Sequence, residues 1–262
     1  MASELQNTMI AVESRPTVAK ALRARPPLPR EHGAWGILLI PFATAVGVRG
    51  VLDLKVALLL AGVLCFYLAR TSYLKCNVKW TAILLAGSVV CTTPLLFVWH
   101  LWWLAAFGAA AAPLAFRKTE RSVAMQLLAV CGLTLTAPAA WYAGTRHLDT
   151  EALLLWSLNV LYFAGGMFYV KMHVAAAMRR SGTKIKWGMQ VLIYYMALLL
   201  VLIALALGKA VSFWVMAAYV PVAVRAFLGV AKLSPVLRIK RLGWTEVGYS
   251  VVYAVLLIIA LR

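Results

Sequence analysis

Acidic side chains are scarce in this chain of 262 residues. Only eight aspartates and glutamates accompany 26 lysines and arginines, and charged residues of both signs make up 13% of the sequence. Hydrophobic residues make up 64%, well above their share in soluble domains, and the mean hydropathy is +0.87. This composition excludes a soluble globular domain and predicts a polytopic membrane protein.

Cysteine is also rare, and the positions of the four cysteines do not indicate a disulfide framework. They show no paired spacing, and three fall within apolar runs, where they act as small hydrophobic residues. The first thirty residues have no continuous apolar stretch of the kind found in a signal peptide. Residues 1–30 are basic and proline-rich, so we expect a mobile cytoplasmic tail before one transmembrane helical domain over residues 31–262.

Long apolar runs fill the rest of the chain. A helix that crosses a bilayer needs ~20 apolar residues and satisfies its own backbone polar groups. The sequence therefore predicts an all-α bundle of nine transmembrane helices, at residues 33–50, 53–70, 80–98, 100–116, 123–145, 151–173, 187–207, 210–230 and 245–262. The short gap between the third and fourth spans predicts a tight helical hairpin.

Prolines are expected to interrupt five of these runs, at Pro41, Pro94, Pro113, Pro138 and Pro221. Two of the prolines begin the same pattern, P-x-A-x-R, at residues 113–117 and 221–225. The two copies lie four helices apart and so share an orientation, which is typical of a parallel duplication. Chance explains the pattern equally well in a sequence so rich in alanine and valine, and both explanations stay open.

Lysine and arginine are distributed unevenly between the two sides of the predicted bundle. One side, with the N-terminus, takes 21 of the 26 cations, and this asymmetry places that side in the cytoplasm and the C-terminus outside. We expect a multi-pass protein of the cytoplasmic (inner) membrane. Anionic lipid headgroups are the expected partners of the net charge of +18, and nucleic acid is not, because the cations lie between spans.

Three glutamates fall at the cytoplasmic mouths of helices: Glu31, Glu120 and Glu246. Ionisable residues at membrane depth are functional candidates. In one interpretation, each carboxylate pairs with a neighbouring arginine or lysine or faces a helix N-terminus. In the other, the three converge on a metal ion or act as acid–base groups.

Two further segments near the cytoplasmic face carry polar groups. The stretch FRKTERSVAMQ, residues 116–126, offers cations that suit oxyanions, and its Gln126 adds a hydrogen-bonding group. In the stretch YVKMHVAAAMRRSGTKIK, residues 169–186, Tyr169 and His173 lie along one helical face, with Lys171 nearby. Histidine spacing gives no support for a haem site.

The opening PREHGAW, residues 29–35, followed by Pro41, resembles the YwiC-like membrane proteins, a family without a settled activity. More distantly, the chain resembles the UbiA-type intramembrane prenyltransferases. That resemblance implies nine helices, cytoplasmic loops over a central cavity, and magnesium held by aspartates with an isoprenoid diphosphate. Its best match is the fifth span, where Ser122, Gln126 and Pro138 follow the family pattern.

The aspartate-rich motifs of the prenyltransferases are absent from the matching positions. Their two aspartates in the sixth span fall on His173 and Ala177, and the segment after Arg70 contains no acid. Magnesium prefers carboxylate oxygens, so we expect no metal and no cofactor. The resemblance then implies a basic cap over a lipid-facing cavity, which would hold an anionic head directly.

Three functions remain open on the sequence alone. The first is a divergent, magnesium-independent prenyltransferase-like enzyme that acts on an isoprenoid or other anionic lipid. The second is a non-catalytic binder or transporter of an anionic lipid or metabolite, and the third is a membrane partner subunit. The expected catalytic residues are Glu31 and His173; the anion-binding residues are Arg70, Arg117, Lys118, Arg121 and Lys171; the cavity-lining or supporting residues are His32, Trp35, Gln126, Tyr169 and Glu246.

Overall fold

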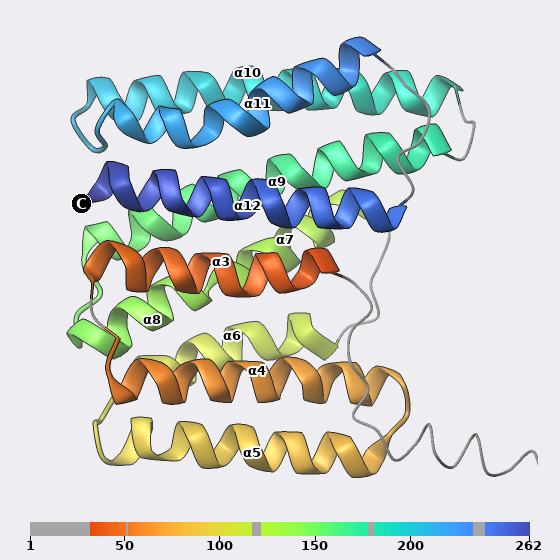
Figure 1. Ribbon diagram of the computed structural model, residues 1–262. Helices are drawn as coiled ribbons and strands as arrows, with labels where there is room; N and C mark the ends of the chain where they lie inside the picture. The colour runs from red at the N-terminus through yellow and green to blue at the C-terminus, as the bar shows by residue number, and fades with distance from the viewer. Residues whose placement is uncertain (1–31, 51, 117–121, 178–180, 233–238) are drawn as a thin grey trace, which may run out of the picture.

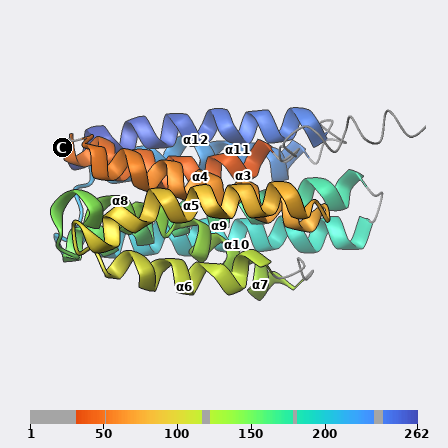
Figure 2. The ribbon, with the colours of Figure 1, turned by 90° about the horizontal axis from the view of Figure 1, so that it is seen from below.

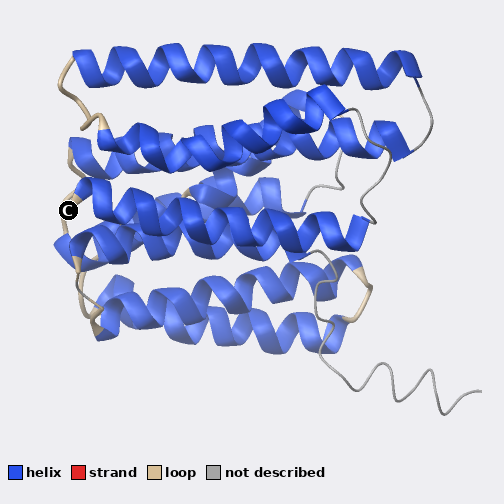
Figure 3. Cartoon of the chain, turned by 45° about the horizontal axis from the view of Figure 1, so that its top comes forward, coloured by secondary structure: helices blue, strands red, loops and turns tan. Residues whose placement is uncertain are grey.

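The computed structural model describes residues 32–50, 52–116, 122–177, 181–232 and 239–262, and all regular structure in these ranges is helical (Figure 3). The helices are α3 (His32–Arg49), α4 (Leu54–Leu74), α5 (Val78–Phe97), α6 (Trp103–Phe116), α7 (Val123–Thr134), α8 (Thr136–Thr145), α9 (Thr150–Ala177), α10 (Ser181–Leu207), α11 (Trp214–Lys232) and α12 (Ile239–Leu261). Each of the nine predicted spans corresponds to a helix, with α7 and α8 together forming the fifth.

Seven of these spans are long and apolar enough to cross a membrane, and α3 and α6 are shorter apolar helices. The helices lie roughly parallel to one another and alternate in direction (Figures 1 and 2). The all-α, polytopic membrane fold is therefore confirmed. We call the end of the bundle where α3 begins, and where the chain order places most lysines and arginines, the basic end.

The first and last described helices close the bundle. Helix α12 packs along α3 and also along α11, and α9 packs along α10 (Figure 1). Near the middle of the bundle, the Asn159 amide of α9 donates to Thr44 Oγ1 of α3 at 3.1 Å, and both side chains are buried. Hydrogen bonds of this kind between helices stabilise membrane bundles by about 0.6 kcal/mol each.

The predicted hairpin of the third and fourth spans is wrong. Helix α5 packs along α4, whereas α6 packs on α7, α8 and α4 and makes little contact with α5. The partner of α5 is set by a close approach at Gly62, whose carbonyl accepts a 2.9 Å hydrogen bond from Ser88 Oγ. A side chain at position 62 would meet the Thr92 methyl carbon at 2.9 Å, so glycine is needed there.

Only one of the five predicted proline interruptions coincides with a helix boundary in the described residues. Pro138 lies just after the break between α7 and α8 and cannot donate to the carbonyl of Thr134. The break allows Thr136 Oγ1 to donate to the Leu38 carbonyl of α3 at 3.0 Å. The other four prolines lie inside α3, α5, α6 and α11, which continue through them.

Candidate functional site

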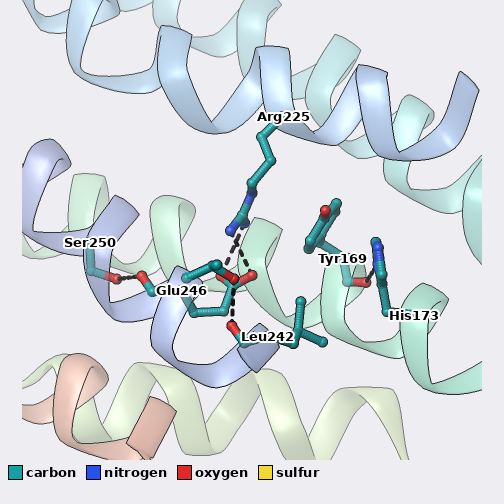
Figure 4. Close-up of polar contacts among 7 residues, drawn as sticks. Tyr169, His173, Arg225, Leu242, Glu246 and Ser250 are labelled. Atoms are coloured by element: carbon teal, nitrogen blue, oxygen red, sulfur yellow. Dashed lines mark hydrogen bonds and ion pairs between the residues drawn. The ribbon is translucent and has the colours of Figure 1, made fainter. Parts of the chain in front are cut away.

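A buried ion pair joins α11 to α12. Arg225 Nη1 lies 2.8 Å from Glu246 Oε1, and Arg225 Nη2 donates to Glu246 Oε2 at 3.0 Å (Figure 4). The two side chains are 9% and 15% exposed. Glu246 is seven residues into α12, or ~10 Å along the helix axis, so the pair lies at membrane depth. The Nη2–Oε2 contact is a charge-assisted hydrogen bond, which is a strong type of contact, and the Nη1–Oε1 contact adds an ion pair.

Two tyrosine rings hold the guanidinium in place. The Arg225 guanidinium carbon lies 4.2 Å from the ring centre of Tyr169 on α9 and 4.3 Å from that of Tyr249 on α12. Gly229 makes room for the first ring, because a Cβ at that position would lie 2.8 Å from Tyr169 Cε2. Cation–π contacts are worth about 2 kcal/mol when desolvated, so three helices cooperate in fixing one cation.

A pocket of about 960 Å³ lies beside this ion pair. It is lined by α3 to α9 and α12, together with Trp187 of α10. Most of its lining is apolar, with many glycines and alanines, and the described charged residues in its wall are Arg70, Lys171 and Glu246. The pocket is thus lined mainly by apolar residues, with a few ionic groups toward the basic end, and the predicted basic cavity that faces the cytoplasm stays a prediction.

The two cations of the pocket wall come from different helices. Arg70 lies four residues before the end of α4, and Lys171 six residues before the end of α9, so both are near the basic end. Lys171 Nζ lies 4.8 Å from the ring centre of Trp187, a cation–π contact. From Ser88 to Leu96, the α5 wall continues ~12 Å toward the opposite end of the bundle.

Glu246 belongs both to the buried ion pair and to the wall of the pocket. Its carboxylate pairs with Arg225 on one side, and the residue also lines the pocket with Gly166 of α9. A Cβ at position 166 would lie 3.4 Å from Glu246 Oε2. Helix α9 therefore passes close to the carboxylate through a position that has no side chain.

The structure brings together some of the predicted site residues. Arg70, Lys171, Gln126 and Glu246 all line the pocket. Tyr169 supports the ion pair from the adjoining face of α9, and its carbonyl lies 3.2 Å from His173 Nδ1, so His173 is close to the tyrosine (Figure 4).

Of the remaining predicted residues, only Trp35 has a described side chain, and it is not part of the pocket lining. Trp35 contacts Tyr67, with ring centres 5.5 Å apart. His32 begins α3, but its side chain is outside the described structure, as are Glu31, Arg117, Lys118, Arg121 and Glu120. Among the described residues, no group of three or more His, Cys, Asp or Glu could hold a metal ion. Convergence of the three glutamates stays a prediction.

Sequence reasoning missed Arg225 as part of the site. The Lys/Arg asymmetry places the cations between spans, and Glu246 is expected to pair with a neighbouring arginine or lysine. Arg225 instead lies within α11, seven residues before its end. Pairing of Glu246 with an arginine is confirmed, with a partner from another helix. The sequence does contain a signal for this arginine, because Arg225 lies after Pro221 within a run apolar enough to span the membrane.

The fold and this site define a polytopic helical membrane protein with an ion pair buried beside an interhelical pocket. The model of the family described as YwiC-like protein matches residues 28–141, which agrees with the resemblance in the N-terminal part. The chain is 27% identical over 215 residues to "Uncharacterized protein YwiC" of Bacillus subtilis (strain 168), covering 76% of this chain and 84% of that protein. No solved structure matches significantly. The relationship to UbiA-type enzymes stays a prediction.

Proposed function

We propose that the protein binds an amphiphile from the membrane, with an anionic head near Arg70 and Lys171 and an apolar chain along α5 and α6. The observation that supports this proposal is the unequal lining of the pocket. Both cations of its described wall lie near the basic end, and the wall beyond Ser88 is mainly apolar. An amphiphile matches that distribution, because one molecule carries both kinds of surface.

The size of the pocket also supports a ligand. Its volume of about 960 Å³ is at the upper end of the range of about 300–1,000 Å³ for small-molecule sites. A membrane subunit that served only to pack against a partner would have no need for such a space. Binding is therefore favoured over a purely structural role.

The test measures thermal stabilisation of the purified protein in a neutral detergent. A ligand that binds the folded state raises its apparent stability by mass action. Dodecyl phosphate should stabilise the wild-type protein and dodecanol should not. The double variant Arg70→Gln/Lys171→Gln should bind the phosphate at least about tenfold more weakly, since it loses two charge-assisted contacts.

A matched control removes the same two charges elsewhere at the basic end. Lys186 and Arg241 are exposed and do not line the pocket, so Lys186→Gln/Arg241→Gln should retain binding. Equal losses in the two double variants would mean that net charge alone attracts the phosphate and that the pocket is not its site.

A prenyltransferase-like reaction is the catalytic form of this proposal. Binding receives more support from the described geometry, because the pairing with Arg225 stabilises Glu246 as a carboxylate that accepts hydrogen bonds, and His173 Nδ1 lies 3.2 Å from the Tyr169 carbonyl. Farnesyl diphosphate, added with magnesium or with a chelator, separates the two forms. Stabilisation that survives the chelator supports a site formed by cations, and release of diphosphate in the presence of an acceptor would show an enzyme.

The proposed orientation places the basic end in the cytoplasm. Cys76 is exposed in the connection between α4 and α5 at that end. A membrane-impermeant maleimide should label Cys76 in inside-out vesicles and leave it unlabelled in intact cells. The Cys76→Ser variant identifies any labelling of the other cysteines, and labelling of Cys76 in intact cells would reverse the orientation.

A further inference from the structure

We infer that the ligand of the pocket donates a hydrogen bond to Glu246, through the opening that Gly166 leaves in α9. This inference rests on the proposed function and narrows the class of ligand. The amphiphile would carry a hydroxyl group or another neutral donor within its chain, away from its anionic head.

The Glu246 carboxylate has accepting capacity left on its pocket side. An ionised carboxylate only accepts hydrogen bonds and offers about four lone-pair positions. Arg225 Nη2 donates one hydrogen bond, to Oε2 at 3.0 Å, and Nη1 adds an ion-pair contact to Oε1 at 2.8 Å. The residue lines the pocket and its side chain remains 15% exposed.

Gly166 determines whether a ligand reaches that carboxylate. It lines the pocket, and a methyl group at this position would lie 3.4 Å from Glu246 Oε2, close enough to cover the oxygen with little displacement. Glycine in a helix interior costs about 1 kcal/mol relative to alanine. Alanine would fit here and favour the helix, so the absence of a side chain suits access to the oxygen.

The donor is expected some distance from the anionic head. Gly166 precedes Lys171 by five residues, which corresponds to ~7.5 Å along the axis of α9. The ion pair is neutral as a whole, so a cationic group gains little there and an anionic group faces a carboxylate. A neutral hydroxyl within the apolar chain satisfies the remaining acceptor.

The experiment compares dodecyl phosphate with a series of dodecyl phosphates that carry one hydroxyl at successive chain positions. Dissociation constants are measured for the wild-type protein and for Gly166→Ala. A hydrogen bond to a charged group corresponds to about a tenfold change in affinity. A mid-chain hydroxyl should tighten wild-type binding by about that factor relative to dodecyl phosphate. This gain should vanish in Gly166→Ala when it is measured against that variant's own affinity for dodecyl phosphate.

Two controls separate the hydrogen bond from other effects. Gly188→Ala places a methyl in ordinary contact with Val230 and Met172, outside the pocket lining, and should keep the gain. Methyl ethers of the same ligands, measured on the wild-type protein, lack the donor and should lose the gain.

The outcomes distinguish this inference from the proposed function. Binding of dodecyl phosphate without a gain from any hydroxyl position, or a gain that the methyl ethers or Gly166→Ala retain, would overturn the inference alone. Failure of dodecyl phosphate and all its hydroxylated analogues to bind would overturn the proposed function and the inference with it.

Discussion

Glu246 lies between two interfaces that differ in packing, one filled by side chains toward α11 and one hollow at the pocket. On the side of α11, the aromatic rings of Tyr169 and Tyr249 enclose Arg225 and leave the pair nearly buried. On the other side, small residues such as Gly33 and Gly108 border a pocket. The apolar character of two helices therefore does not determine whether the interface between them is filled or hollow. The size of the side chains on the facing surfaces decides it.

The largest expected effect comes from breaking the ion pair. Glu246→Ala should lower the free energy of unfolding by about 3–5 kcal/mol, because it leaves a buried guanidinium without its counter-charge. Thermal or denaturant unfolding in detergent measures the loss.

The double variant Arg225→Leu/Glu246→Leu should recover most of that stability. Apolar replacement of a whole buried pair is often neutral or stabilising, and Arg225 Nε has no hydrogen-bond partner among the described residues. If the double variant is no more stable than Glu246→Ala, the loss arises from altered packing of α12 and not from the unpaired charge.

A smaller effect is expected from crowding the aromatic side. Gly229→Ala places a methyl 2.8 Å from Tyr169 Cε2 and must displace the ring from the guanidinium. Overpacking of this kind should lower unfolding free energy by about 1–3 kcal/mol. Gly188→Ala, with contacts no closer than 3.8 Å, is the control and should be neutral or stabilising.

A half-buried carboxylate outside the spans provides the contrast with Glu246. Asp53 lies before α4, accepts a 3.0 Å hydrogen bond from the Val56 N–H and lies 3.1 Å from Lys55 Nζ. Partial burial opposes ionisation, but the Val56 N–H and Lys55 together hold the pKa of the Asp53 carboxyl below its ordinary value. Asp53→Ala should lower unfolding free energy by about 1 kcal/mol, the usual value for a helix cap.

The contribution of Asp53 should depend on pH in one direction. Because its folded pKa is depressed, its stabilisation is complete above the unfolded pKa and disappears as pH falls through the folded value. Unfolding curves of wild-type protein and Asp53→Ala should therefore converge in acid. A difference that persists at low pH would assign the effect to backbone conformation and not to the carboxylate.

Filling the hollow side should have the smallest effect on stability. A Cβ at Gly108 has no neighbour within 4 Å, so Gly108→Leu should change unfolding free energy by less than about 1 kcal/mol. It should nevertheless weaken binding of dodecyl phosphate, because position 108 lines the pocket. Gly248→Leu meets equally open space outside the pocket lining and should leave binding unchanged. Equal binding by both variants would place the ligand elsewhere.

The charged residues of the described pocket wall and Gln126 could be predicted from the sequence, whereas the apolar remainder of the wall and the partner of Glu246 could not. Glu246 is a candidate because ionisable groups are expensive at membrane depth. Arg70 and Lys171 are candidates as cations for an anionic head, and Gln126 as a hydrogen-bonding group that follows the family pattern. Arg225 is not among the predicted site residues, since the Lys/Arg asymmetry counts cations by side of the membrane and cannot show that one of them points into the bundle. The prediction of a hairpin between α5 and α6 was wrong for a related reason. A short connection does not by itself make two helices pack together, and the close approach at Gly62 brings α5 against α4.

The sequence by itself determined the nine helical spans and the concentration of cations toward one end, because apolar length and backbone hydrogen bonding in lipid leave few alternatives. Only the tertiary structure decided that Arg225 meets Glu246 between two tyrosines, and that Gly166 brings the carboxylate to a pocket. Hydropathy measures how favourably each helix is transferred into lipid. Which residues face one another depends on the rotation and spacing of helices far apart in the chain.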